Sequence, residues 1–217
     1  MEESFDEVKE EIYLTDKEIF LRIWTSPRLV LKYINDKEYG EYVTILLVLA
    51  GILSAFDRAM AKNLGDQMPL WGVICICIAG GALFGWLSFY IYAALVSWTG
   101  DLLHGEGDTE SILRIMSYAK IPAVVFIVPY AMQIAIYGNK LFQSNVTIVS
   151  FDWLGSIFFY SCMALSLVLS IWSIVLIIIG ISEVQKLSIW KSILNLLLPI
   201  LVIGVPIFII IFLFSAS

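Results

Sequence analysis

The chain has 217 residues, of which 60% are hydrophobic and 15% are charged, and its formal net charge is −6. This composition excludes an ordinary soluble globular domain and is typical of a polytopic membrane protein. Eight of the nineteen acidic residues fall within the first 18 positions, and so acidic an end repels nucleic acid and anionic lipid. We therefore expect a membrane protein with no nucleic-acid partner, and the acidic start also predicts no cleavable signal peptide.

Residues 1–41 form a polar arm, which we separate from a membrane domain at residues 42–217. Within the arm, the stretch Thr15 to Glu18 has the S/T-x-x-E spacing of a helix capping box. The apolar residues at positions 19, 20, 23 and 24 follow directly and share one helix face. This pattern predicts a short amphipathic helix.

A second amphipathic helix is predicted to begin at Ser26 and Pro27. Serine can cap a helix, proline suits its first turn, and Arg28 falls on the polar side. The two helices either lie on the membrane surface or dock a partner, or they pack beneath the chain's own membrane bundle.

Five apolar segments follow, and each can cross a hydrocarbon core, which needs about 20 helical residues. They occupy about residues 42–60, 68–98, 121–137, 153–182 and 192–214. The predicted fold class is therefore all-α, a polytopic integral membrane protein with five transmembrane helices preceded by amphipathic helices. The second and fourth segments exceed an upright span, so we expect them to tilt, kink or protrude.

Basic residues indicate the orientation of these spans. With the N-terminus in the cytoplasm, ten Lys and Arg residues lie inside and only Arg58, Lys62 and Lys140 lie outside. Because cytoplasmic segments are enriched in Lys and Arg, we predict a cytoplasmic N-terminus and an external C-terminus. Tryptophans 71, 98, 153 and 190 fall near the predicted span ends, as interfacial aromatic belts do.

The polar segment between the second and third spans holds the sole histidine, His104, among several carboxylates. Such residues can ligate a metal or carry a proton, yet their spacing matches neither an EF-hand nor a zinc site. Gly105 and Gly107 indicate a flexible segment, so the preferred interpretation is a solvated loop with no metal. The three cysteines, at 75, 77 and 162, are expected to be small buried hydrophobes.

Small residues and prolines in the apolar segments are candidates for helix packing. Gly81 and Gly85 form a G-x-x-x-G motif, which permits close approach either within the bundle or across a dimer interface. The prolines are at 122, 129, 199 and 206, so the two pairs are offset by 77 residues, as are two Ser-Ile-containing stretches before them. This offset suggests a parallel repeat of two hairpins, in which each proline needs a neighbouring helix to compensate its lost hydrogen bond.

Enzymatic chemistry has little support in the sequence. The apolar segments place no ionisable residue in mid-membrane, and Asp57 and Arg58 close the first span as charges that snorkel or pair at its boundary. The sequence contains no phosphate-binding loop and no H-E-x-x-H metal motif. We therefore expect neither an enzyme nor a cofactor. A glycosylation sequon occurs at Asn145, a short pattern expected by chance.

Three stretches in fixed order give the chain a family resemblance. They are I-W-T-S-P-R at 23–28, L-H-G-E-G-D-T at 103–109 running through Arg114 and Tyr118 to Pro122, and W-S-I-V-L at 172–176 leading to Pro199. Together they resemble the Yip (Ypt/Rab-interacting) family of five-helix membrane proteins, in its prokaryotic branch. The matched positions Ser26, Pro27, Arg28, His104, Gly105, Gly107, Arg114, Tyr118 and Pro122 are the candidate interaction residues.

The resemblance implies five membrane helices, a cytoplasmic N-terminus and location in a prokaryotic cytoplasmic membrane. Eukaryotic members of the family resemble trafficking scaffolds that bind small GTPases. This chain lacks their Asp-Leu-Tyr-Gly-Pro signature, so GTPase binding is not carried over to it.

Two functions are compatible with these observations. The first is a non-enzymatic membrane scaffold or adaptor, embedded in the lipid bilayer, that recruits an unidentified protein or a second copy of itself. The alternative is a transporter or channel for a small neutral or lipidic solute, with the proline-containing third and fifth helices as moving walls.

Overall fold

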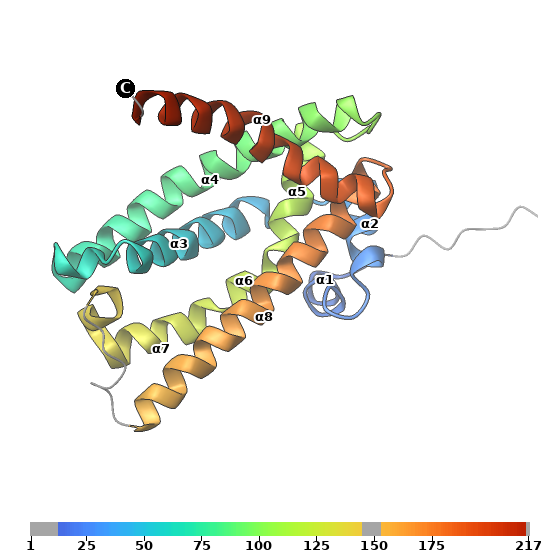
Figure 1. Ribbon diagram of the computed structural model, residues 1–217. Helices are drawn as coiled ribbons and strands as arrows, with labels where there is room; N and C mark the ends of the chain where they lie inside the picture. Colours follow the sequence, from blue (N-terminus) through green and yellow to red (C-terminus); the bar gives the residue numbers. More distant parts are fainter. Residues whose placement is uncertain (1–12, 145–152, 216–217) are drawn as a thin grey trace, which may run out of the picture.

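The computed structural model describes residues 13–144 and 153–215. Within these ranges the chain consists of helices joined by turns and irregular segments, without strands (Figure 1). The acidic residues at positions 2–11 and the Asn145 sequon lie outside the described residues. Five apolar helical segments are long enough to cross a membrane. The predicted fold class is therefore confirmed, since hydrophobic length alone determines these spans.

The arm forms two short helices, α1 (Asp16–Arg22) and α2 (Pro27–Asp36). The capping box at the start of α1 is confirmed, because the Glu18 amide donates to Thr15 Oγ1 at 3.4 Å and the Thr15 amide donates to Glu18 Oε2 at 3.0 Å. Ser26 occupies the cap position of α2, but its side chain makes no capping hydrogen bond. The predicted cap at Ser26 is therefore wrong, and α2 begins with Pro27 in its first turn.

The five spans agree closely with the predicted segments. They are α3 (Val43–Ala61), α4 (Leu70–Leu102), the segment of α6 (Ile121–Val125), α7 (Ile127–Tyr137) and η2 (Gly138–Phe142), α8 (Trp153–Val184), and α9 (Ile189–Ser215). A 3₁₀ turn, η1 (Leu64–Asp66), joins α3 to α4. Each of the long helices α4 and α8 runs without a break for more than 30 residues, which exceeds the thickness of a hydrocarbon core at about 1.5 Å per residue.

Helix α5 (Thr109–Ala119) lies at the centre of the molecule (Figure 1). Its eight residues from Ile112 to Ala119 are all buried. Helices α2, α3, α4 and α8 all contact it. A short helix buried on every side is a core element, so the bundle is built around α5 rather than around the spans alone.

Two prolines explain why the third span is broken. Pro122 and Pro129 lack the amide hydrogen that would bond to the carbonyl four residues earlier. The chain leaves regular helix between α5 and α6 and again between α6 and α7, in each case within three residues before the proline. Pro199 and Pro206 lie inside α9, which continues through them. The proposed repeat is thus not reproduced in the backbone, because its first copy is divided and its second is one helix.

Helix α4 compensates the backbone groups that Pro199 leaves free in α9. Thr99 Oγ1 lies 2.7 Å from the side-chain oxygen of Asn195 and 3.3 Å from its carbonyl oxygen, four residues before Pro199. The next carbonyl, of Leu196, accepts from Tyr92 Oη at 2.7 Å. These contacts satisfy the requirement that exposed backbone groups in a membrane find partners in neighbouring helices.

The G-x-x-x-G motif lies inside the hairpin of α3 and α4, which run side by side (Figure 1). A Cβ atom added at Gly81 would lie 2.6 Å from Ile52 Cα, and one added at Gly51 would lie 2.8 Å from Gly85 Cα. The two backbones therefore touch at a level where only glycine fits. This contact places the motif within the bundle.

The cysteines and tryptophans of the spans differ in exposure. Cys77 and Cys162 are buried, as predicted, but Cys75 is exposed on the outside of α4. The expectation of three buried cysteines is therefore wrong for Cys75, which lies two residues from Cys77 and so on another helix face. The four tryptophans near the span ends, Trp71, Trp98, Trp153 and Trp190, are 50–81% exposed, as interfacial aromatic residues are.

Substitution of Gly81 by alanine tests the α3–α4 contact. Because the new methyl group would meet backbone atoms of α3, we expect Gly81→Ala to destabilise the protein by about 1–3 kcal/mol. Thermal unfolding of the purified protein in detergent measures this change. Gly80→Ala is the matched control, since no atom lies within 4 Å of a Cβ at Gly80. Equal behaviour of the two variants would contradict the close contact.

Candidate interaction site

Most of the candidate interaction residues lie at one end of the bundle, which we call the arm end. It comprises α1, α2, α5, the glycine turn (residues 103–108, between α4 and α5) and the α8–α9 turn (residues 185–188). Contacts of α2 with α5 and α8, and of α4 with α5, join these parts.

Gln185 ties the glycine turn to the end of α8. Its side chain is completely buried, and its Oε1 accepts a hydrogen bond from the Gly107 amide at 3.0 Å. Its Nε2 reaches the Val96 carbonyl of α4 at 3.5 Å, and its own carbonyl accepts from the Glu106 amide at 3.3 Å. One buried amide therefore joins three segments, and buried amides of this kind are costly when left unpaired.

The glycines of the turn are required by the closeness of Gln185. A Cβ atom at Gly100 or Gly105 would overlap the Gln185 side-chain amide, and one at Gly107 would lie 2.6 Å from Val184 Cγ1. The sequence suggested that Gly105 and Gly107 make the segment flexible, and the packing shows a different role. Their missing side chains admit Gln185 into the turn.

His104 occupies the exposed tip of this turn. Its backbone has φ 63°, the left-handed conformation that ends the α4 helix. Among the described residues, no group of three or more His, Cys, Asp or Glu side chains could hold a metal ion. The carboxylate of Asp108 instead caps α5, where hydrogen bonding to Ser111 lowers the pKa of Asp108.

Two ion pairs brace the arm end. Lys186 pairs with Glu106 and so links the two turns. Arg28 Nε lies 2.7 Å from Glu183 Oε1 and links α2 to the last turn of α8. The neighbouring Ser26 is exposed and Pro27 is partly buried.

The arm packs onto its own bundle. Five apolar residues of the arm are completely buried, namely Ile19, Ile23, Val30, Leu31 and Ile34. They belong to one hydrophobic cluster with residues of α5 and α8. Of the two placements that the sequence left open, the described structure therefore has the helices packed beneath the bundle.

Asp16 fastens the start of α1 through two tyrosines. Tyr42 Oη donates to Asp16 Oδ2 at 2.6 Å, and Tyr39 Oη donates to Asp16 Oδ1 at 2.7 Å. These hydrogen bonds lower the pKa of Asp16 below its usual 3.8. The Tyr42 amide in turn donates to Tyr118 Oη at 3.3 Å, and burial raises the pKa of Tyr118 to about 12.

Arg114 is a charged residue inside the core. Its side chain is 8% exposed, and its Nη1 has no hydrogen-bond partner among the described residues. Pro122 is also buried, at the start of α6. Arg114, Tyr118 and Pro122 therefore lie beneath the arm-end surface, while Arg28 and His104 lie on it.

Other candidates lie away from the arm end. Gly81 and Gly85 pack against α3, Pro129 lies in α7, and Pro199 and Pro206 lie in α9. Sequence reasoning missed Gln185 altogether. The available signal was the group Gly100, Gly105 and Gly107, which can indicate close approach of another residue as well as flexibility.

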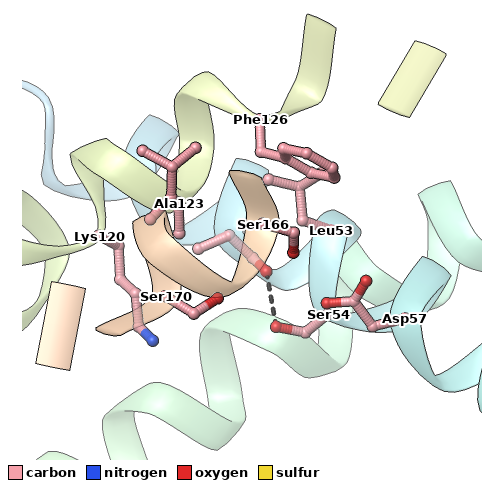
Figure 2. A pocket seen from close by; sticks show the side chains of 10 residues that line it. Leu53, Ser54, Asp57, Lys120, Ala123, Phe126, Ser166 and Ser170 are labelled. Atoms are coloured by element: carbon pink, nitrogen blue, oxygen red, sulfur yellow. Dashed lines mark hydrogen bonds between the residues drawn. The ribbon is translucent and has the colours of Figure 1, made fainter. Parts of the chain in front are cut away.

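A polar pocket of about 110 Å³ lies within the bundle, between α3, α6 and α8 (Figure 2). Asp57 and Lys120 both line it. Asp57 is four residues inside the end of its span, Val43–Ala61. The sequence interpretation assigned Asp57 to the membrane boundary, and it did not foresee that this carboxylate lines a pocket.

The arrangement described above defines an all-helical integral membrane protein with five apolar spans and a helical arm folded against one end. In a comparison with protein-family models, residues 21–211 match the Yip1 domain. The chain therefore belongs to the Yip1 domain family, which confirms the resemblance seen in the sequence. Comparisons with curated proteins and with solved structures found no match.

The contact between Gly105 and Gln185 can be tested by paired substitutions. We expect Gly105→Ala to destabilise the protein by about 1–3 kcal/mol, because the new methyl group overlaps the Gln185 amide. In a Gln185→Ala background the same substitution should cost much less, since the overlapping group is gone. Thermal unfolding of the four proteins measures the coupling. Gly40→Ala is a control, as a Cβ there meets nothing closer than 3.8 Å; additive effects would contradict the contact.

The lowered pKa of Asp16 predicts a pH-dependent attachment of α1. A carboxylate whose pKa is lower in the folded state stabilises that state above its unfolded pKa. Its contribution is lost as the pH falls below 3.8 through the lowered value. The protection of the α1 amides, which is the slowing of their exchange relative to that of an unstructured peptide at the same pH, should therefore fall over that range in the wild type and should be low on both sides of it in Asp16→Asn. Wild-type protection that does not change over this range would refute the role of Asp16.

Proposed function

We propose that this chain is a non-enzymatic membrane scaffold whose arm end recruits a protein partner. The observation that carries the proposal is the packing of the arm. A buried apolar face, the Arg28–Glu183 ion pair and the Asp16–tyrosine hydrogen bonds hold α1 and α2 in one position. A surface fixed in advance binds a partner at a smaller entropic cost than a mobile arm does.

The outer surface of the arm is suited to contact. Leu21 is 61% exposed on α1 and Leu29 is 36% exposed on α2, beside the exposed cations Arg22 and Arg28. Apolar residues flanked by charged ones are typical of protein interfaces. The partner is either a different protein or a second copy of the chain.

The orientation forms part of the proposal. The excess of Lys and Arg at the arm end supports a cytoplasmic N-terminus and an external C-terminus. The membrane that we propose is a prokaryotic cytoplasmic membrane. A cytoplasmic arm end would meet soluble partners. Small GTPases are not proposed among them, because the signature of the GTPase-binding members is missing from the sequence.

Transport is not favoured by the pocket in the bundle. Its volume of about 110 Å³ is smaller than the roughly 300–1,000 Å³ of typical small-molecule sites. The scaffold role is therefore the function that we propose.

Site-specific photo-crosslinking in native membranes tests the scaffold role. We expect a photoreactive residue at Leu21 to crosslink one defined protein, identified by mass spectrometry, because Leu21 lies on the exposed arm. The same probe at Lys62, which is exposed at the opposite end of α3, is the control. The crosslink at a second arm position, Leu29, should be abolished by Leu21→Asp with no change in membrane insertion. Identical products from Leu21 and Lys62, or none from either arm position, would contradict the proposal.

A further inference from the structure

The pocket between α3, α6 and α8 carries opposite charges at its two ends. Figure 2 shows Lys120 at one end and Asp57 at the other, with Ser166 and Ser170 of α8 between them. Ala50, Leu53, Ser54 and Asp57 recur at helical spacing, so one face of α3 lines the pocket. Along α3 this face extends for about 10 Å, at 1.5 Å per residue.

Both charges lack an ionic partner. Neither Asp57 nor Lys120 forms an ion pair or a side-chain hydrogen bond with another residue in the described part of the chain. Lys120 Nζ lies 5.9 Å from the centre of the Phe89 ring, a cation–π contact that leaves its hydrogen-bond donors free. Ser54 Oγ turns back to the Ala50 carbonyl at 2.8 Å and so does not neutralise Asp57. Charged groups within a bilayer are costly unless they are paired.

A further unpartnered polar group lies near Asp57. Tyr130 is 3% exposed, and its Oη has no hydrogen-bond partner among the described residues. The ring is held by Phe56 and Phe126, at centroid distances of 5.5 and 6.0 Å. Tyr130 does not itself line the pocket, but its ring packs on the lining residue Phe126. A buried hydroxyl without a partner is a place where a polar group is missing.

We propose that this pocket binds the headgroup of a phospholipid that carries a primary ammonium, with the ammonium at Asp57 and the phosphate at Lys120. The two charges match the two ends of such a zwitterion, and the Ser166 and Ser170 hydroxyls lie where its bridging oxygens would pass. The volume of about 110 Å³ equals that of roughly four water molecules. The roughly eight non-hydrogen atoms of such a headgroup exceed that volume. The headgroup therefore lies partly outside the enclosed space, on the side where Asp57 is exposed, and the acyl chains remain outside.

The surroundings favour a lipid over a free solute. Met163 and Leu167 of α8 lie one helical turn before the pocket residues Ser166 and Ser170 and are 63% and 62% exposed. These side chains face the position of the hydrocarbon core and would contact acyl chains. The inference goes beyond the scaffold role and stands whether or not a protein partner is found.

The test uses the full chain in detergent micelles doped with phosphatidylethanolamine, phosphatidylglycerol or phosphatidylcholine, with bound lipid counted by native mass spectrometry. We expect phosphatidylethanolamine to bind best. Phosphatidylglycerol has no ammonium, and the quaternary ammonium of phosphatidylcholine cannot donate a hydrogen bond. Asp57→Asn should lower the preference for phosphatidylethanolamine over phosphatidylglycerol about tenfold, as for the loss of one charge-assisted hydrogen bond. Lys120→Gln should weaken both lipids.

Arg58→Gln is the matched control, because it changes the neighbouring charge on α3 outside the pocket lining. Ser54→Leu fills the pocket without changing a charge. If the charge variants do not fold, this variant tests the proposal, and we expect it to lose the preference for phosphatidylethanolamine. Wild-type binding without headgroup preference, or an unchanged preference in Ser54→Leu, would overturn the proposal. Displacement of the lipid by equimolar free phosphoethanolamine would overturn the lipid assignment and indicate a site for a soluble zwitterion.

Discussion

Burial of α5 from Ile112 to Ala119 is the constraint on which the rest of the structure depends. A helical segment without an exposed face needs neighbours on all sides, and α2, α3, α4 and α8 supply them. The arm is therefore part of the core, because removal of α1 and α2 would expose residues of α5 and α8 to water. This also explains why the arm helices are short and amphipathic, since their stability comes from the face that they bury.

Two close approaches complete this core, and glycine permits both. In the α3–α4 hairpin the backbones touch at Gly51, Gly81 and Gly85. At the arm end the glycine turn encloses the Gln185 amide. The first contact fixes two spans against each other, whereas the second fixes the end of α8 against the start of α5. Both depend on an absent side chain, so substitutions there affect the whole bundle and not a local loop.

The sequence predicted the five spans and the capping box because each depends on residues close together in the chain. Length and hydropathy define a span, and Thr15 and Glu18 are three residues apart. Gln185 and the buried state of Arg114 could not be predicted, since both depend on segments far apart in sequence. The prolines show the same limit. Pro199 is tolerated inside α9 because Thr99 and Tyr92 of α4 supply donors, and no local pattern reveals these partners.

The central position of α5 has a consequence for synthesis. Along the chain α5 precedes α8, which covers it. While the ribosome makes the third span and the loop after it, the nascent protein holds Arg114 and the apolar side chains of α5 without their final cover. Insertion of α8 then covers α5. A chain interrupted before that point would expose to chaperones and proteases an apolar segment that also carries a charge. Quality control in the cell can therefore recognise an unfinished copy from this one helix.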